Sequence, residues 1–170
     1  KSRYAESAAA DRLKTSLGQV RAKAEQAREA RRLQALWDYQ SVPAEGGVQR
    51  SASIFSKTVA VEEGSPAPVP DAQLVLRDHP AWGRSAYLVL QGGDFDCYRG
   101  CRLPITLDGK PAKSLPGSRP DTDEAIAMFI EDERALWKMV QGAKTVEIEF
   151  PVKGLGKRSA VFEVAGLDPG

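Results

Sequence analysis

The two cysteines of the chain, Cys97 and Cys101, are separated by three residues in the stretch DCYRGCR. A redox pair normally has two intervening residues at the start of a helix, where the helix N-terminus lowers a thiol pKa. A zinc site needs three or four ligands, and the chain has no other cysteine and only one histidine. The sequence therefore favours a disulfide between flanking strands of a hairpin. Free buried thiols and metal or redox chemistry are the alternatives.

A disulfide here would also indicate a cellular compartment. Structural disulfides persist in oxidising spaces such as the periplasm or the cell exterior. We therefore expect this chain to face the periplasm.

Other residues that could support catalysis occur in weak patterns. His79 precedes a proline in LRDHPAWG, where capping a turn is the better interpretation than activating a nucleophile. Asp94 and Asp96 are two residues apart, but this spacing is common by chance within turns. GLGK lacks the ending of a P-loop. The sequence predicts no catalytic residue, no metal site and no cofactor, and a hydrolase using His79 or these acids is an alternative.

Composition and charge narrow the class of partner. The chain is 42% hydrophobic and 28% charged, which is typical of a globular protein. Residues 1–40 carry nine Lys/Arg and five Asp/Glu, a net charge of +4, whereas residues 41–170 carry fifteen and eighteen, a net charge of −3. An acidic body argues against nucleic acid as a partner. No apolar run approaches the roughly eighteen residues of a membrane span. Because the sequence begins at Lys1 without Met, we expect an anchor or signal upstream.

Residues 1–40 are predicted to form a helical stalk. From about Tyr4 to Trp37 there is no proline and alanine is abundant, as in a long helix. Apolar residues recur at spacings of four, three, four and three: Leu13, Leu17, Val20, Ala24 and Ala27. Such a stripe favours pairing with another chain, which includes a second copy of this one, and a solvated helix packed on its own domain is the alternative. We expect Leu36 to Tyr39 to close the helix.

Residues 41–170 are predicted to form an antiparallel β-sandwich-like domain. Short runs alternate apolar and polar side chains, as half-buried strands do. The expected strands are Ser53–Val61, Ala72–Asp78, Ser85–Gln91, Cys101–Asp108, Thr145–Val152 and Ala160–Leu167, with a glycine hairpin before the last. Two loops separate them, at Glu62–Pro70 and Lys110–Asp123. Long loops on a rigid sheet often carry binding surfaces.

Residues 124–141 have two interpretations. AIAMFI is an unbroken apolar run of strand length, although its apolar residues also fit a helical face. EDERALWKMVQG is helical on either interpretation, with Gly142 expected as its C-terminal cap. We favour a strand followed by a helix. The predicted fold class is thus mostly β (α+β), with one helix in the C-terminal half and a long helix in front.

The order of several motifs resembles a group of poorly characterised envelope proteins of Gram-negative bacteria. The motifs are W-x-Y (Trp37, Tyr39), LRDHPAWG, SAYLVLQGGDFDCYRGCRLPITLDGKPA, FIEDERALWKMVQGAKTVEIEF and FEVAGL. The body is also distantly similar to the C-terminal domain of accessory lipoproteins associated with type VI secretion. The resemblance covers residues 37–167. It implies a β-sandwich-like domain behind a membrane anchor and carries no enzymatic residues with it.

Together these features predict a non-enzymatic, periplasm-facing interaction domain that is anchored in the envelope and binds a protein or cell-wall partner. An immunity or inhibitor protein that neutralises a secreted hydrolase is the first alternative, and a cell-wall hydrolase is the second. Aromatic and guanidinium side chains often anchor interfaces. The expected contact residues are Tyr98 and Arg99 in the disulfide loop and Lys113 and Arg119 in the long loop.

Overall fold

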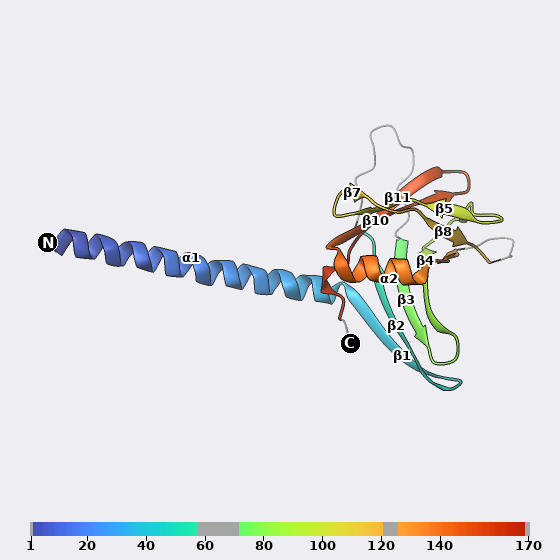
Figure 1. Ribbon diagram of the computed structural model, residues 1–170, viewed down its shortest axis with the longest axis horizontal. Helices are drawn as coiled ribbons and strands as arrows, with labels where there is room; N and C mark the ends of the chain where they lie inside the picture. Colours follow the sequence, from blue (N-terminus) through green and yellow to red (C-terminus); the bar gives the residue numbers. More distant parts are fainter. Residues whose placement is uncertain (1, 58–71, 121–125, 169–170) are drawn as a thin grey trace.

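The long N-terminal helix projects from a β-rich body (Figure 1). The computed structural model describes residues 2–57, 72–120 and 126–168. Helix α1 spans Ser2–Ala35 and is followed at once by a strand that begins at Trp37. The expectation that Leu36 to Tyr39 closes the helix is therefore wrong. Trp37 and Tyr39 belong to the first strand of the body, so the stalk ends about five residues before the predicted boundary at residue 40.

Eleven strands in the described residues form two antiparallel sheets. The seven-stranded sheet has the order β1-β2-β3-β4-β9-β8-β5, and the four-stranded sheet has the order β11-β10-β6-β7. Their bounds are β1 Trp37–Ala44, β2 Gly47–Phe55, β3 Ala72–His79, β4 Gly83–Leu90, β5 Cys101–Leu103, β6 Ile105–Leu107, β7 Lys110–Pro111, β8 Leu115–Ser118, β9 Ala127–Ile130, β10 Thr145–Val152 and β11 Gly156–Glu163. The predicted fold class, a mostly β antiparallel domain with a long helix in front and one helix in the C-terminal half, is confirmed.

At Pro104 the chain passes from the larger sheet to the smaller sheet. The segment from Cys101 to Asp108 was expected to be one strand, but β5 pairs with β8 in the larger sheet and β6 pairs with β10 in the smaller sheet. Proline lacks the N–H that a continuous ladder needs, and the Pro104 carbonyl instead accepts a hydrogen bond from Glu149 N. The predicted hairpin between β4 and β5 is also wrong, because β4 pairs with β3 and β9.

The loop predicted from Lys110 to Asp123 contains two short strands, β7 and β8, and its last three residues lie outside the described part of the chain. The other predicted loop, Glu62–Pro70, lies outside the described residues entirely. The strand followed by a helix is confirmed as β9 and α2 (Glu133–Gly142). Asp132 caps α2, since its side chain accepts a hydrogen bond from Ala135 N. The C-terminal cap is Ala143 rather than Gly142.

The core lies between the two sheets and under α2. Alternate residues of β10, Val146, Ile148 and Phe150, are fully buried, as the period of two in that strand predicted. Phe150 makes an edge-to-face contact with Phe95, with ring centroids 5.6 Å apart. Leu136 is the largest buried side chain that α2 adds. The core thus fixes α2 across the inner face of the larger sheet.

The C-terminal end of α1 is fixed to the body by one buried carboxylate and one glycine. Glu163, whose side chain is 8% exposed, receives Arg32 Nη2 at 2.6 Å and Lys57 Nζ at 2.5 Å. Gly166, in the short 3-10 helix η1 (Val164–Gly166), packs directly on the backbone of Leu33, where a side chain would have no room. Within the described residues, no helix is both long and apolar enough to cross a membrane.

Candidate functional site

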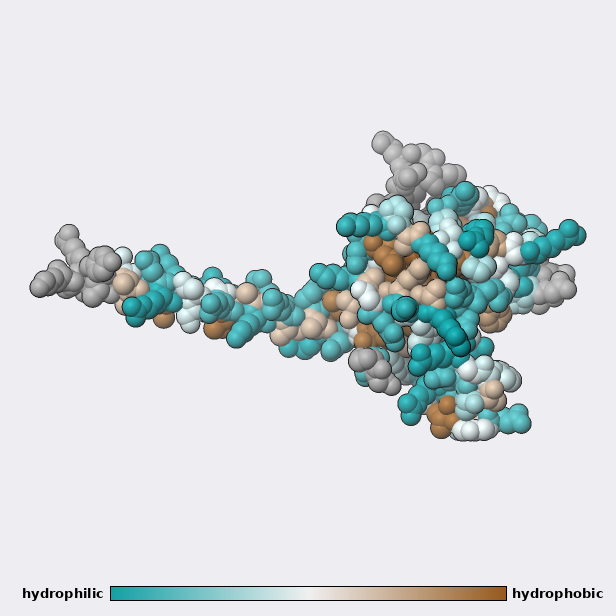
Figure 2. All heavy atoms as spheres, in the orientation of Figure 1, coloured by the Kyte–Doolittle hydropathy of each residue, from teal (hydrophilic) through white to brown (hydrophobic). Residues whose placement is uncertain are grey.

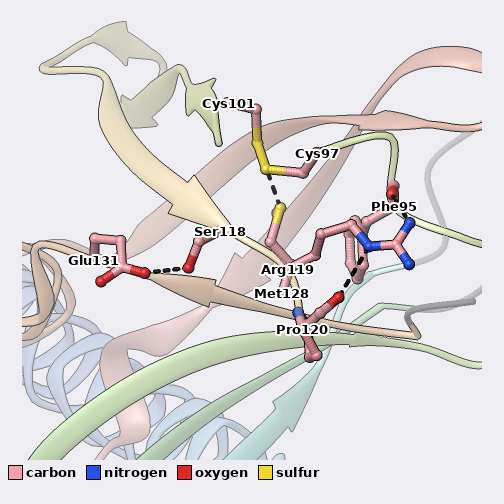
Figure 3. Close-up of a disulfide and its surroundings, with 8 residues drawn as sticks. All are labelled: Phe95, Cys97, Cys101, Ser118, Arg119, Pro120, Met128 and Glu131. Atoms are coloured by element: carbon pink, nitrogen blue, oxygen red, sulfur yellow. Dashed lines mark hydrogen bonds between the residues drawn. A yellow bond between two sulfur atoms is a disulfide. The ribbon is translucent and has the colours of Figure 1, made fainter. Parts of the chain in front are cut away.

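The predicted disulfide is present and ties the 97–101 loop to the underlying sheet. Cys97 and Cys101 are bonded, with their Cα atoms 5.1 Å apart. Cys97 is buried, and Cys101 Sγ lies 3.6 Å from Met128 Sδ (Figure 3). In this state the two sulfur atoms are neither thiolate nucleophiles nor metal ligands.

A buried ion pair lies beside the disulfide loop. Arg119 Nη1 is 2.8 Å from Asp94 Oδ1, and the two side chains are 3% and 10% exposed. The Arg119 guanidinium also lies 4.1 Å from the centre of the Tyr98 ring, whose hydroxyl donates to Asp94 at 3.2 Å. Figure 3 shows the guanidinium turned toward Phe95, whose carbonyl oxygen it reaches at 3.3 Å. Arg119 was expected to be a contact residue, but its side chain is buried in this structure, so little of it is available to a partner.

The other three expected contact residues lie in two different regions. Arg99 is exposed, with a left-handed backbone at φ 62°, and Tyr98 is 48% exposed although its hydroxyl is bonded. The Lys113 side chain reaches the N-terminal end of α2 instead, where its ammonium is 3.5 Å from the Asp132 carboxylate. The disulfide loop therefore presents Arg99 and part of Tyr98, and Lys113 belongs to another region.

His79 caps the turn between β3 and β4, as the sequence indicated. Its Nδ1 accepts hydrogen bonds from Ala81 N at 3.0 Å and Trp82 N at 3.2 Å. An imidazole that accepts at Nδ1 carries its proton at Nε2. The buried ring stacks on Trp82 with centroids 4.0 Å apart. The lone pair that a general base would use is therefore occupied by the turn.

One acidic residue of the body, Asp108, is likewise used in local structure. Asp108 accepts hydrogen bonds from Thr145 N at 2.8 Å and Lys144 N at 2.9 Å. These N–H donors, that of Thr145 first, lower the pKa of Asp108 below its ordinary value. Within residues 2–57, 72–120 and 126–168, no group of three or more His, Cys, Asp or Glu side chains is arranged to hold a metal ion.

The described part of the chain contains a groove that the sequence did not predict. Strands β1 and β2 continue past α2 as a long hairpin (Figure 1). Across the sheet, Tyr39 faces Ala52, Ala52 faces Leu76, and Leu76 faces Ala86. Directly opposed residues of antiparallel strands project from the same face. This row and its neighbour form the floor of what we call the β1–α2 groove.

Charged side chains form the second row of the floor. Ser41 faces Arg50, Arg50 faces Asp78, and Asp78 faces Arg84 along the same three strand pairs. Arg50, Asp78 and Arg84 are all exposed. The Arg84 guanidinium lies over the Trp137 ring of α2, 4.6 Å from its centre, a favourable cation–π distance. This contact joins the sheet floor to the helical wall.

Three adjoining hollows give the groove its length. The central hollow has a volume of about 200 Å³ and is lined by Tyr39, Arg84 and Trp137 among others. A second hollow of about 580 Å³ shares Arg84, Trp137 and Gln141 and extends to Trp82, which is 75% exposed. A third of about 420 Å³ shares Tyr39, Leu167 and Asp168. The groove is thus elongated and carries an aromatic side chain in every hollow.

The groove runs beside the edge of the larger sheet. Strand β1 pairs only with β2 among the described strands, and six of its eight residues, from Asp38 to Pro43, are exposed. An unpaired edge offers backbone N–H and C=O groups to an incoming strand. The aromatic residues Tyr39 and Trp82 are the one sequence signal that could have pointed to this groove. Both are exposed, but only strand pairing brings them to hollows of the same groove.

The Trp137 indole N–H has a further peculiarity. It is buried and finds no acceptor among the described residues, and the same holds for the Trp37 indole N–H. Buried donors are normally paired. Trp137 is therefore held in the wall by its ring contacts rather than by a hydrogen bond.

No family model matches this chain, and the searches of curated proteins and of solved structures likewise found no match.

Proposed function

We propose that this protein is a non-enzymatic interaction domain that binds an extended polypeptide segment of a partner in the β1–α2 groove. The observation that carries the proposal is the convergence of Tyr39, Arg84 and Trp137 on one open hollow. Tyr, Trp and Arg are the side chains most often found at the energetic centres of interfaces. Here they come from β1, β4 and α2, so the fold itself brings them together.

The shape of the groove supports a polypeptide over a compact small molecule. The central hollow of about 200 Å³ is smaller than the roughly 300–1,000 Å³ of usual small-molecule sites, and it shares lining residues with a hollow on either side, so the three form one elongated groove rather than one compact site. A hollow of this size suits one anchoring side chain, with neighbouring side chains in the flanking hollows. The free β1 edge beside it would add main-chain hydrogen bonds.

Charge also bears on the class of partner. The central hollow contains Arg50 and Arg84 but also Asp78 and Asp168. Nucleic acid binding favours a continuous basic surface, and this mixture of signs does not provide one. A polypeptide carrying both polar and apolar side chains fits such a lining better.

The proposal also covers the location of the protein. The disulfide supports an oxidising compartment, and we propose that the domain faces the periplasm and is anchored to the envelope. The 34-residue α1 would then separate the body from its anchor. At 1.5 Å per residue, a helix of this size spans about 50 Å.

A displayed library of random peptides, selected against the whole chain, tests the proposal. Selected peptides should bind wild type, lose about tenfold or more in affinity to Arg84→Gln, and bind Arg99→Gln unchanged. A tenfold loss corresponds to about 1.4 kcal/mol, within the range expected for an interface arginine. Arg99 is the matched control because it is also an exposed arginine but lies in the disulfide loop. Loss with Arg99→Gln alone, or selection of no peptide, would contradict the proposal.

A further inference from the structure

Helix α1 exposes an apolar stripe that the body does not cover. Leu13 is 63% exposed, Leu17 50% and Val20 61%, and the same face continues through Ala24 and Ala27. The spacings of four and three residues keep these side chains on one side of a helix. Figure 2 shows isolated hydrophobic patches on the largely hydrophilic surface of the helix. Large apolar side chains repeated along one exposed line mark a contact surface.

The stripe has the width of a coiled-coil seam. Two apolar residues recur in each heptad, with Leu17 and Ala24 at position a and Leu13, Val20 and Ala27 at position d. A helix lying on a membrane surface has a broader apolar face that usually includes Trp or Phe. This stripe is narrow and has no aromatic residue, and its alanines let a second helix approach closely. A helix is therefore the occupant that fits.

The charges beside the stripe are all positive. Positions e and g, which flank the seam on either side, carry four basic residues and no acidic one between residues 9 and 30: Lys14, Arg21, Lys23 and Arg28. The acidic residues Asp11, Glu25 and Glu29 occupy positions b and f, away from the seam. The four basic flanking residues form no ion pair with any residue that the structure describes.

This charge arrangement disfavours pairing with a second copy. In a parallel pair, position g of one helix meets position e of the next heptad in its partner, so Lys23 would face Arg28. In an antiparallel pair, e meets e and g meets g, and every charged contact is again between two cations. Like charges across a seam are destabilising. The complementary surface is one with carboxylates at these flanking positions.

We infer that α1 pairs with an acidic helix of another protein, one whose apolar a and d seam is flanked by Glu or Asp. The stripe supplies the buried contacts, and Lys14, Arg21, Lys23 and Arg28 select the partner by charge. This surface is separate from the β1–α2 groove, so the inference does not rest on the proposed function of the groove.

Two synthetic peptides of about four heptads test the inference on the whole chain. Both have Leu at positions a and d, but one has Glu and the other Lys at positions e and g. The acidic peptide should bind, the basic peptide should not, and added salt should weaken binding. Sedimentation of the chain alone should show no dimer formed through α1. Binding to lipid is tested with vesicles of phosphatidylserine and phosphatidylcholine and, as the control, with vesicles of phosphatidylcholine alone. Neither kind of vesicle should bind through α1.

Matched variants locate the contact on the helix. Lys23→Gln with Arg28→Gln lowers the net charge by two beside the seam and should weaken binding of the acidic peptide about fivefold. Gln19→Glu with Gln26→Glu also lowers it by two, but at position c, and should have little effect. Circular dichroism checks that helicity is retained in both. The inference would be overturned if the two peptides bound equally, if the acidic peptide did not bind, or if the two variants had equal effects. It would also be overturned by a dimer that is lost when Leu17 is replaced, or by binding of anionic vesicles through α1.

Discussion

The guanidinium of Arg119 is buried against the carboxylate of Asp94, at 2.8 Å, although the two residues are 25 positions apart in sequence. Asp94 precedes the disulfide loop and Arg119 follows β8. Their ion pair therefore fastens the two sides of the segment that contains the disulfide. This relationship makes Arg119 a structural residue and leads to the first prediction.

Replacing Arg119 with Met should destabilise the fold by about 3–5 kcal/mol, because Asp94 would be left as a buried charge without its main counterion. Urea unfolding monitored by fluorescence measures the change. The double variant Asp94→Asn with Arg119→Met should recover part of the loss. A single variant as stable as wild type would show that the pair contributes nothing.

Removing the disulfide should have a smaller effect. The bonded cysteines are four positions apart, and closing so short a loop stabilises a fold by about 2 kcal/mol in the chain-entropy account. Cys97→Ser with Cys101→Ser, compared with wild type under oxidising conditions, should lower the free energy of unfolding by about this amount. Wild type under reducing conditions is the control. If the double variant and the reduced wild type each lost far more than about 2 kcal/mol of unfolding free energy, the geometry of the loop would also be holding the adjacent ion pair.

The attachment of α1 to the body should depend on pH through Glu163. The Lys57 ammonium, and after it the Arg32 guanidinium, lower the pKa of Glu163, although burial acts in the opposite direction. A carboxylate with a lowered folded-state pKa stabilises the fold above its unfolded pKa, which is about 4.3 for glutamate. That contribution is lost as pH falls through the lower folded-state value. The attachment should thus be intact at neutral pH and weaken below about pH 4.

Amide hydrogen exchange measures this attachment directly. In Glu163→Gln at neutral pH, exchange at residues 33–36 should accelerate several-fold, whereas exchange in β10 should not change. Glu29→Gln is the control, since Glu29 also binds Arg32 but is exposed and lies within α1 itself. Equal acceleration in both variants would mean that Arg32 acts within the helix alone.

Trp137 offers a test of the groove wall. Because its buried indole N–H has no acceptor among the described residues, replacing Trp137 with Phe removes an unpaired donor and keeps a ring under Arg84. The free energy of unfolding should change by less than about 1 kcal/mol, whereas Trp137→Ala should cost roughly 2 kcal/mol for a half-buried aromatic. Chemical denaturation of both variants distinguishes them. Equal losses would indicate that the N–H is in fact paired.

Local patterns in the sequence were sufficient for most of the body. The alternation in Thr145–Val152 and the apolar run before EDERALW correctly predicted β10, β9 and α2. The disulfide could be predicted because two cysteines without other ligands leave few choices. These features depend on neighbours within about ten residues, and such signals are visible in one sequence.

Features that depend on distant partners were missed. Trp37 and Tyr39 read as the end of a helix because their strand forms only by pairing with β2, which begins at Gly47. Arg119 read as a surface residue because its partner Asp94 is far away in sequence. The β1–α2 groove was not predicted for the same reason, since its lining comes from four strands and a helix. Burial of a charge is decided by tertiary structure rather than by residue type.

The most direct measurement of the central claim is crosslinking in the cells that naturally produce this protein. A photoreactive amino acid placed at Tyr39 or at Gln141 lies in the lining of the groove, and one placed at Arg99 in the disulfide loop is the control. We predict that Tyr39 and Gln141 crosslink to the same polypeptide and that Arg84→Gln abolishes both adducts. An adduct from Arg99 alone, or groove adducts that persist in Arg84→Gln, would contradict a polypeptide-binding role for the groove.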